Sequence, residues 1–216
     1  MSPLRRLVAT PEGIVGTALL AALILAALLA PYLFPRDPMS IAGPAMLRPF
    51  QDLALPLGTD RLGRDVLAGL IHGARTSLAV GFAAAAASLL VGAIIGTAAG
   101  FAGGLIDEIL MRITDAFQTV PGFLLALAMI SVAGPSLPMV VLAIALGAWP
   151  GPARVARAEV LSLRERDFVA AARTMGMHSL EIAYREILPN ALPPVLALSS
   201  VIVAAAILIE AALSFL

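Results

Sequence analysis

Cysteine is absent from this chain of 216 residues, which excludes disulfide bonds, thiol catalysis and thiolate metal sites. Lysine is absent too: all fourteen basic residues are arginine, which we attribute to genomic bias because no site chemistry requires it. The two histidines, His72 and His178, are isolated, so their spacing predicts no metal site. The net charge is zero and gives no argument for nucleic-acid binding.

Charge of either sign is scarce. Only 13% of the residues are charged and 60% are hydrophobic, whereas soluble domains carry roughly 25% charge. The mean hydropathy of +0.98 agrees with this. The composition therefore predicts an integral membrane protein, and its long uncharged runs predict an all-α, polytopic fold that lies in a lipid bilayer.

The first uncharged run, residues 13–34, would measure about 33 Å as a helix, which is enough to cross a bilayer. It follows Arg5 and Arg6, so a secretory signal is the alternative interpretation. The run exceeds the roughly 7–15 residues of a signal core. We therefore expect this span to be retained, with residues 1–35 forming a short stub and the first membrane helix.

Four further spans are expected. The uncharged run 116–153 is too long for one crossing, and prolines within residues 134–138 should break it because proline lacks an amide proton. The expected spans are residues 76–106, 116–133, 138–153 and 191–215. Residues 36–75 would form an outer-face segment, and residues 76–216 the core of four spans. The charged residues near 101–118 are expected to form a solvated amphipathic elbow.

Three glycines, Gly92, Gly96 and Gly100, recur every four residues in the second span. One helical turn places them in a smooth stripe where another helix backbone can approach closely. The partner is either a moving helix of another subunit or a helix of the same chain.

Arginine counts in the short loops predict the orientation. With the N-terminus inside, nine arginines lie inside and five outside, and the reverse topology inverts these numbers. The sequence thus favours a cytoplasmic N-terminus and a cytoplasmic location for the charged segment 154–190.

The 154–190 segment is expected to form two helices. Residues 154–173 show a helical pattern, Gly176 suits a sharp bend, and residues 179–188 form a second short helix that Pro189 ends. Glu181 and Arg185 would pair on its surface. By pattern alone, this is either a projection that takes up motion from a soluble motor or an amphipathic hairpin without a partner.

The 154–190 segment resembles the coupling loop by which membrane subunits of ATP-binding-cassette importers grip their ATPases. That pattern reads Glu-Ala-Ala, three residues, Gly, and later Ile-Leu-Pro. Ala170 stands here in place of the glutamate, which affects a polar contact and not the backbone. The resemblance implies a coupling role for Asp167 and Arg173 and for the positions that carry the pattern: Ala170, Ala171, Ala172, Gly176, Ile187, Leu188 and Pro189.

Residues 58–65, Gly-Thr-Asp-Arg-Leu-Gly-Arg-Asp, and residues 73–78 are similar to the segment before the second span in one permease subunit of dipeptide, oligopeptide and nickel importers. Asp60, Arg61, Arg64 and Asp65 alternate in sign, which suggests a surface ion-pair network. This is either a structural elbow or a contact for substrate or a binding protein.

Residues 210–216 resemble the end of the fifth span in the same permeases. Glu210 is the one acid in this apolar run, so it either lines the pore or reaches the interface. The family has a sixth span, and we expect one beyond Leu216.

The resemblance implies the type I ABC importer transmembrane fold in the bacterial inner membrane and transport of peptides, with a nickel or other metal chelate as the alternative. It implies no catalytic residue and no directly bound cofactor. The partners would be a second permease subunit, two ATPases that bind ATP and Mg, and an outer binding protein. A secondary transporter should instead show mid-span ionisable residues and inverted repeats. An intramembrane enzyme would need a nucleophile with a base, or a set of metal ligands, on its spans. The predicted spans of this chain contain neither His nor Cys.

Overall fold

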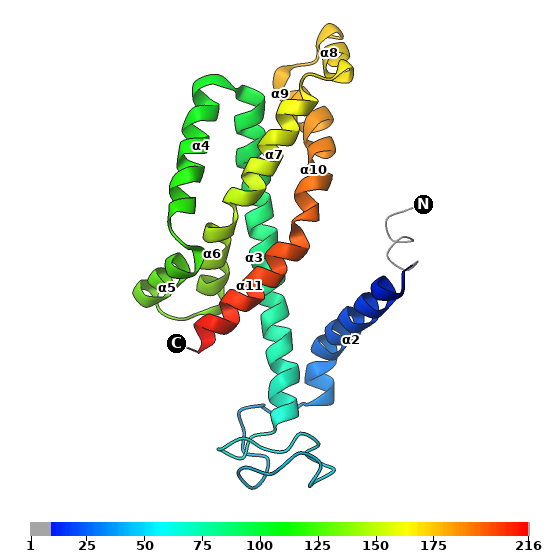
Figure 1. Cartoon of the computed structure of the whole chain (residues 1–216), viewed down its shortest axis with the longest axis vertical. Helices are drawn as coiled ribbons and strands as arrows, with labels where there is room; N and C mark the ends of the chain where they lie inside the picture. Colours follow the sequence, from blue (N-terminus) through cyan, green and yellow to red (C-terminus); the bar gives the residue numbers. More distant parts are fainter. Residues whose placement is uncertain (1–9, 216) are drawn as a thin grey trace. The chain divides into compact units, whose positions relative to one another are not determined.

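The computed structural model describes residues 10–215, and these fold into helices without a β-strand (Figure 1). Arg5, Arg6 and Leu216, on which part of the sequence interpretation rests, lie outside the described residues. The elements, in chain order, are α2 (Pro11–Leu33), α3 (Val66–Ala102), α4 (Gly104–Thr119), α5 (Gly122–Ala133), α6 (Leu137–Ala148), α7 (Pro150–Leu163), α8 (Asp167–Thr174), α9 (Ser179–Glu181), the π-helix η1 (Ile182–Ile187), α10 (Leu188–Ala197) and α11 (Ser199–Ser214).

The chain divides into two compact units, Met1–Ala79 and Val80–Leu216. In the first unit, Thr10 caps α2 by accepting a hydrogen bond from Gly13 N. The sequence placed the next helix at residue 76, but α3 begins ten residues earlier, at Val66. The reason is Asp65, whose Oδ1 accepts hydrogen bonds from Leu67 N and Ala68 N. This cap sets the helix start, and charged side chains further on do not prevent helix formation.

In the second unit, the glycine stripe of α3 packs against α7. A Cβ at Gly96 would lie 2.2 Å from Ala153 O, and one at Gly92 would lie 2.5 Å from Pro152 Cβ. A Cβ at Gly100 would lie 2.9 Å from Arg157 O. The structure therefore shows the intrachain packing, one of the two partners that the sequence allowed.

The span expected at residues 116–133 is divided differently from the prediction. α4 continues to Thr119, and α5 starts after Pro121 with a bend of 81° between the two helices. The expected solvated elbow is instead the 16-residue helix α4, which packs on α7. Asp107 and Asp115 each pair with an arginine of α7; the Asp107 pair is mostly shielded from solvent, and the Asp115 pair is about half-exposed.

The prediction of a single helix over residues 154–173 is also wrong. α7 ends at Leu163, and α8 starts at Asp167 in a new direction. The break lets Val169 and Ala172 pack against Ile182 and Ile187, and this burial outweighs the local preference for one straight helix.

Pro189 does not end the second helix, as the sequence suggested. The chain continues from Ser179 to Ala197, and six residues form the π-helix η1 just before the proline. Leu188 N donates to Ala183 O, five residues back, so the turn is widened ahead of Pro189. Asn190 lies within this continuous stretch, where its Nδ2 donates to Glu186 O at 2.6 Å.

The structure allows the five crossings that the sequence predicts. α2 and α3 are each long and apolar enough to span a bilayer. The other three candidates are bent pairs: α4 with α5, α6 with α7 at 44°, and Ser179–Ala197 with α11 at 48°. The sixth span expected after Leu216 stays a prediction.

The close packing of α3 on α7 gives a stability prediction. A methyl group at Gly96 cannot fit without displacing Ala153 and Ala156. We expect Gly96→Ala to lower the free energy of unfolding by about 1–3 kcal/mol, the usual range for an overpacked site. Thermal unfolding of the purified chain in detergent measures this.

Gly73→Ala is the matched control, because Gly73 also lies in α3 and a Cβ added there would meet nothing within 4 Å. It should leave the chain unchanged or stabilise it by up to about 1 kcal/mol. Equal unfolding temperatures for the two variants would contradict the packing of α3 on α7.

Candidate functional site

The 154–190 segment forms a helical hairpin with its own small core. α8 folds back onto η1, and both pack beside the end of α7 and the start of α10 (Figure 1). The core consists of six buried side chains from these four helices: Val160, Val169, Ala172, Ile182, Ile187 and Ala191. The hairpin is therefore a preformed projection and not a loose loop.

The π-helix explains why this core closes. Ile182 and Ile187 are five residues apart, and in a regular α-helix they would point to different sides. The wider turn of η1 brings both into the core, where they are 1% and 0% exposed. In a regular α-helix Leu180 and Tyr184 would share a face with Ile187, but the structure leaves these two 67% and 56% exposed.

Gly176 makes the bend between the two helices. Its φ is +81°, in the left-handed region that favours glycine. Gly176 N donates to Arg173 O and Met177 N donates to Ala172 O, which is the hydrogen-bond pattern of a Schellman motif. Met177 packs against the core next to Ala172, as that motif requires. The bend predicted from the sequence is confirmed.

Four large apolar side chains of the hairpin lie outside this core and are exposed. We define the hairpin face as Phe168, Met175, Leu180 and Tyr184, which are 37%, 74%, 67% and 56% exposed. Ala170 and Ala171 are exposed on α8 beside it. Arg185 lies with its guanidinium 5.9 Å from the Tyr184 ring centre and pairs with Glu181 at 2.5 Å. The predicted Glu181–Arg185 pair is confirmed.

The residues that the resemblance implied for coupling fall into two groups. Ala172 and Ile187 are buried in the hairpin core, where Ala172 packs α8 against η1. Leu188 is half-buried. The exposed members are Asp167, Ala170, Ala171, Arg173, Gly176 and Pro189.

The second candidate is the 34–65 loop of the first unit, where the 58–65 motif organises the backbone. Gly58 and Gly63 have φ of +74° and +75°, and a Cβ at Gly58 would lie 2.1 Å from Leu47 O. The buried Thr59 side chain accepts a hydrogen bond from Leu47 N at 3.0 Å and donates to Pro44 O. These residues hold distant parts of the loop together, which supports the structural elbow.

The prediction of an ion-pair network at this motif is wrong. Within residues 34–65, no ion pair joins Asp60, Arg61, Arg64 and Asp65. Asp60 Oδ1 instead accepts from Leu62 N and Arg64 N, at 2.8 and 2.9 Å. The hydrogen bond from the Arg64 backbone is the main cause that lowers the pKa of Asp60 below its ordinary value, with smaller contributions from Leu62 N and the Arg64 charge against a partial desolvation.

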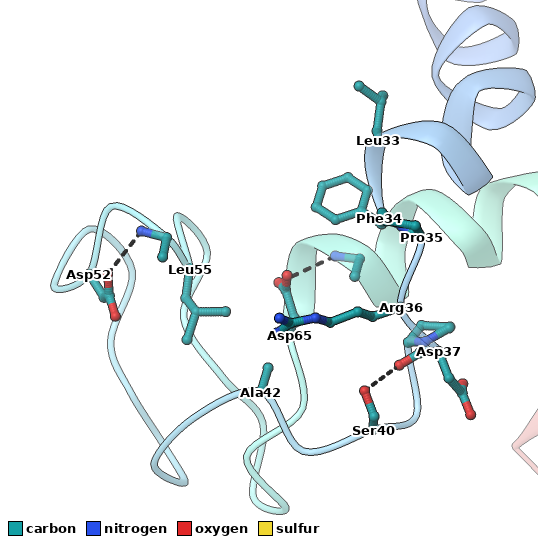
Figure 2. A pocket seen from close by; sticks show the side chains of 13 residues that line it. Leu33, Phe34, Pro35, Arg36, Asp37, Ser40, Ala42, Asp52, Leu55 and Asp65 are labelled. Carbon is teal, nitrogen blue, oxygen red and sulfur yellow. Dashed lines mark hydrogen bonds between the residues drawn. The ribbon is translucent and has the colours of Figure 1, made fainter.

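A cavity of about 360 Å³ lies between the two ends of the 34–65 loop. Figure 2 shows Phe34 and Arg36 from its start and Asp65 from its end around this cavity. Asp65 is the one member of the predicted motif that lines it. Asp60 and Arg64 do not, so the structure does not gather the three predicted outer-face residues into one site.

Glu210 lines a smaller cavity, of about 270 Å³, beside the α5–α6 connection. Its carboxylate accepts a hydrogen bond from Ser214 Oγ at 3.2 Å, and its side chain is half-exposed. Of the sequence's two alternatives, lining the pore and reaching the interface, the structure selects neither.

Sequence reasoning missed one ion pair between distant helices, Asp107 with Arg157. Arg157 Nε and Nη2 donate to the two carboxylate oxygens of Asp107 at 2.5 and 2.6 Å. The partners are fifty residues apart in the chain, so no local spacing points to them. Among residues 10–215, no group of three or more His, Asp or Glu residues is placed to hold a metal ion.

The comparisons with known proteins agree with this architecture. Residues 88–216 match the family described as "Binding-protein-dependent transport system inner membrane component". The chain belongs to this family. It is a multi-pass membrane permease subunit.

Among its relatives is a putative peptide transport system permease protein of Brucella suis biovar 1. It is 40% identical over 212 residues, covering 98% of this chain and 71% of the relative. The di/tripeptide transport system permease protein of Pseudomonas aeruginosa is 38% identical, with 95% and 70% covered. The dipeptide transport system permease protein of Bacillus subtilis is 34% identical, with 98% and 66% covered.

The role of Thr59 in the 34–65 loop can be tested by an isosteric change. Thr59→Val keeps the shape but leaves Leu47 N and Pro44 O without their partner. An unsatisfied buried polar group costs about 1–3 kcal/mol. We expect faster proteolytic cleavage of residues 36–65 in the variant, measured on the purified membrane protein.

Thr76→Val is the control, since the Thr76 hydroxyl donates only to His72 O within an exposed part of α3. It should leave the cleavage rate unchanged. If Thr59→Val also leaves it unchanged, the motif does not hold the loop together.

Proposed function

We propose that this chain is one permease subunit of an ATP-binding-cassette importer that moves di- or oligopeptides across the bacterial inner membrane. Membership of the binding-protein-dependent family supports the importer class. The names of the relatives support the substrate, because they describe peptide, dipeptide and di/tripeptide permeases. Nothing in these comparisons favours the nickel alternative.

The observation that carries the proposal is the hairpin of the 154–190 segment. It has a rigid core, a glycine bend and an apolar face that the described residues of this chain leave exposed. Met175 and Leu180 are 74% and 67% exposed. Exposure of apolar side chains to water is unfavourable unless another protein buries them. We assign this face, with Ala170 and Ala171 beside it, to contact with a partner ATPase. Asp167 and Arg173, at the two ends of α8, would orient the contact.

The rest of the assembly follows from one hairpin per chain. One hairpin engages one ATPase, so an importer with two ATPases needs a second, homologous permease subunit. ATP and Mg would bind to the ATPases and not to this chain. A binding protein on the other side of the membrane would deliver the peptide. The hairpin would lie in the cytoplasm together with the N-terminus, as the arginine counts favour.

The proposed ATPase contact depends on the Gly176 bend. A Cβ at Gly176 would meet nothing within 4 Å, so a substitution there acts through the backbone alone. A β-branched residue in the left-handed region costs about 1–2 kcal/mol. We expect Gly176→Val to reduce ATPase binding and substrate-stimulated ATP turnover of the assembled complex in lipid, with membrane insertion unchanged.

Gly176→Asn is the matched control, because asparagine tolerates the left-handed conformation. It should retain most of the turnover. Turnover at the wild-type level in Gly176→Val would contradict the assignment of the hairpin to the ATPase contact.

A further inference from the structure

α4 is a 16-residue helix, and the chain changes direction sharply at both of its ends. At its start, Gly103 and Gly104 have φ of +65° and +53°, so the reversal from α3 rests on two consecutive residues in the left-handed region. At its end, the chain bends by 81° before α5, at Val120 and Pro121. Both breaks lie outside α4, so a change of angle at either one would leave the hydrogen bonds of this helix intact.

Apolar burial does little to fix α4 within this chain. The helix fully buries one side chain, Thr114. Its large apolar residues are open, with Leu105, Ile106 and Ile109 at 71%, 54% and 50% exposure. The position of α4 therefore depends on a few specific contacts with its neighbours.

Two ion pairs join α4 to α7, beside the edge contact of Phe117 with Trp149 at the start of α7. The stronger one is the two-pronged pair of Asp107 with Arg157, in which the side chains are 15% and 34% exposed. Such fork-to-carboxylate pairs fix direction as well as distance. Arg154 contacts Asp115 at 2.6 Å, but this pair is about half-exposed and contributes less.

α7 also continues directly into the hairpin. Val160, one turn beyond Arg157, is part of the hairpin core. Arg164, at the end of α7, donates to Gly100 O of α3 at 3.0 Å. Figure 1 shows α4 and α7 running alongside each other in the second unit, which agrees with their ion pairs.

We infer that Asp107 and Arg157 are positioning residues of the transport step. When the hairpin moves with its ATPase, α7 moves with it, and the Asp107–Arg157 pair makes α4 follow. α4 then changes its angle at both breaks and carries the start of α5 with it. This inference rests on the proposed function, since it requires that the hairpin receives the motion of an ATPase.

The test measures coupling and not only activity. The full complex, with the second permease, both ATPases and the binding protein, is reconstituted in liposomes. Uptake of radiolabelled dialanine and trialanine is divided by the ATP hydrolysed in the same sample. We expect Asp107→Asn and Arg157→Gln each to lower this ratio at least about fivefold, the lower end of typical coupling between sites.

α4 itself supplies the matched control. Glu108 and Arg112 form an exposed ion pair at 3.7 Å within α4, which does not reach α7. Glu108→Gln and Arg112→Gln should leave the ratio within about twofold of wild type, because an exposed pair of this kind contributes little. The double variant Asp107→Asn/Arg157→Gln should lose no more than either single variant, since the second change removes an interaction already lost.

Arg157→Lys covers the case in which the neutral variants fail to assemble. It keeps the charge but cannot form both bonds of the fork, so we expect an intermediate ratio in a complex with the wild-type unfolding temperature. A wild-type ratio in an assembled complex that carries Arg157→Lys, or in one that carries Asp107→Asn, would overturn the inference. So would equal losses of uptake and hydrolysis, or single effects that multiply in the double variant. Failure of the proposed function looks different, because the wild-type complex would then bind no ATPase or take up no peptide.

Discussion

The close contact of α3 with α7 is the constraint on which the second unit depends. Gly96 lies so near Ala153 that no side chain fits between the two backbones. This contact holds α7 along α3 and so positions the end of α7, from which the hairpin continues. The hairpin core then forms on Val160, the last buried residue of α7. A change in the α3–α7 contact would therefore alter the position of the hairpin as well as the stability of the chain.

Apolar burial stabilises the hairpin of the second unit, and ion pairs position its helix α4. Apolar burial makes the hairpin one rigid piece, because Val169, Ile182 and Ile187 are fully enclosed. Ion pairs and the edge contact of Phe117 with Trp149 hold α4, while Leu105, Ile106 and Ile109 stay exposed and both helix ends are interrupted. A membrane subunit that changes shape needs both properties: a stiff part to receive motion, and a part that can change its angle without losing its partner.

Sequence reasoning succeeded where the signal is local. The uncharged runs predicted apolar helices that allow up to five crossings, Gly176 predicted the bend, and the spacing of Glu181 and Arg185 predicted their pair. Element boundaries failed where a contact distant in sequence decides them. The break after Leu163 exists so that α8 can pack on η1, and no pattern around Leu163 shows it.

The π-helix and the Asp107–Arg157 pair were missed for related reasons. A π-helix adds one residue to a turn, so regular α-helical spacing does not place Ile182 and Ile187 on one buried face as the structure does. The aspartate and the arginine are fifty residues apart, and only the fold brings them together. In the 58–65 motif the charges suggested ion pairs, but the backbone amides of Leu62 and Arg64 satisfy Asp60 instead.

The central claim is that the exposed side of the hairpin contacts an ATPase while its buried side does not. The absence of cysteine lets single cysteines be labelled with a maleimide without background from this chain. Ala171→Cys should label rapidly in the permease alone and slowly in the complex with its ATPases. Ala172→Cys should label slowly in both, and Leu53→Cys, at a position 95% exposed in the 34–65 loop, rapidly in both. Rapid labelling of Ala171→Cys in the assembled complex would contradict the claim.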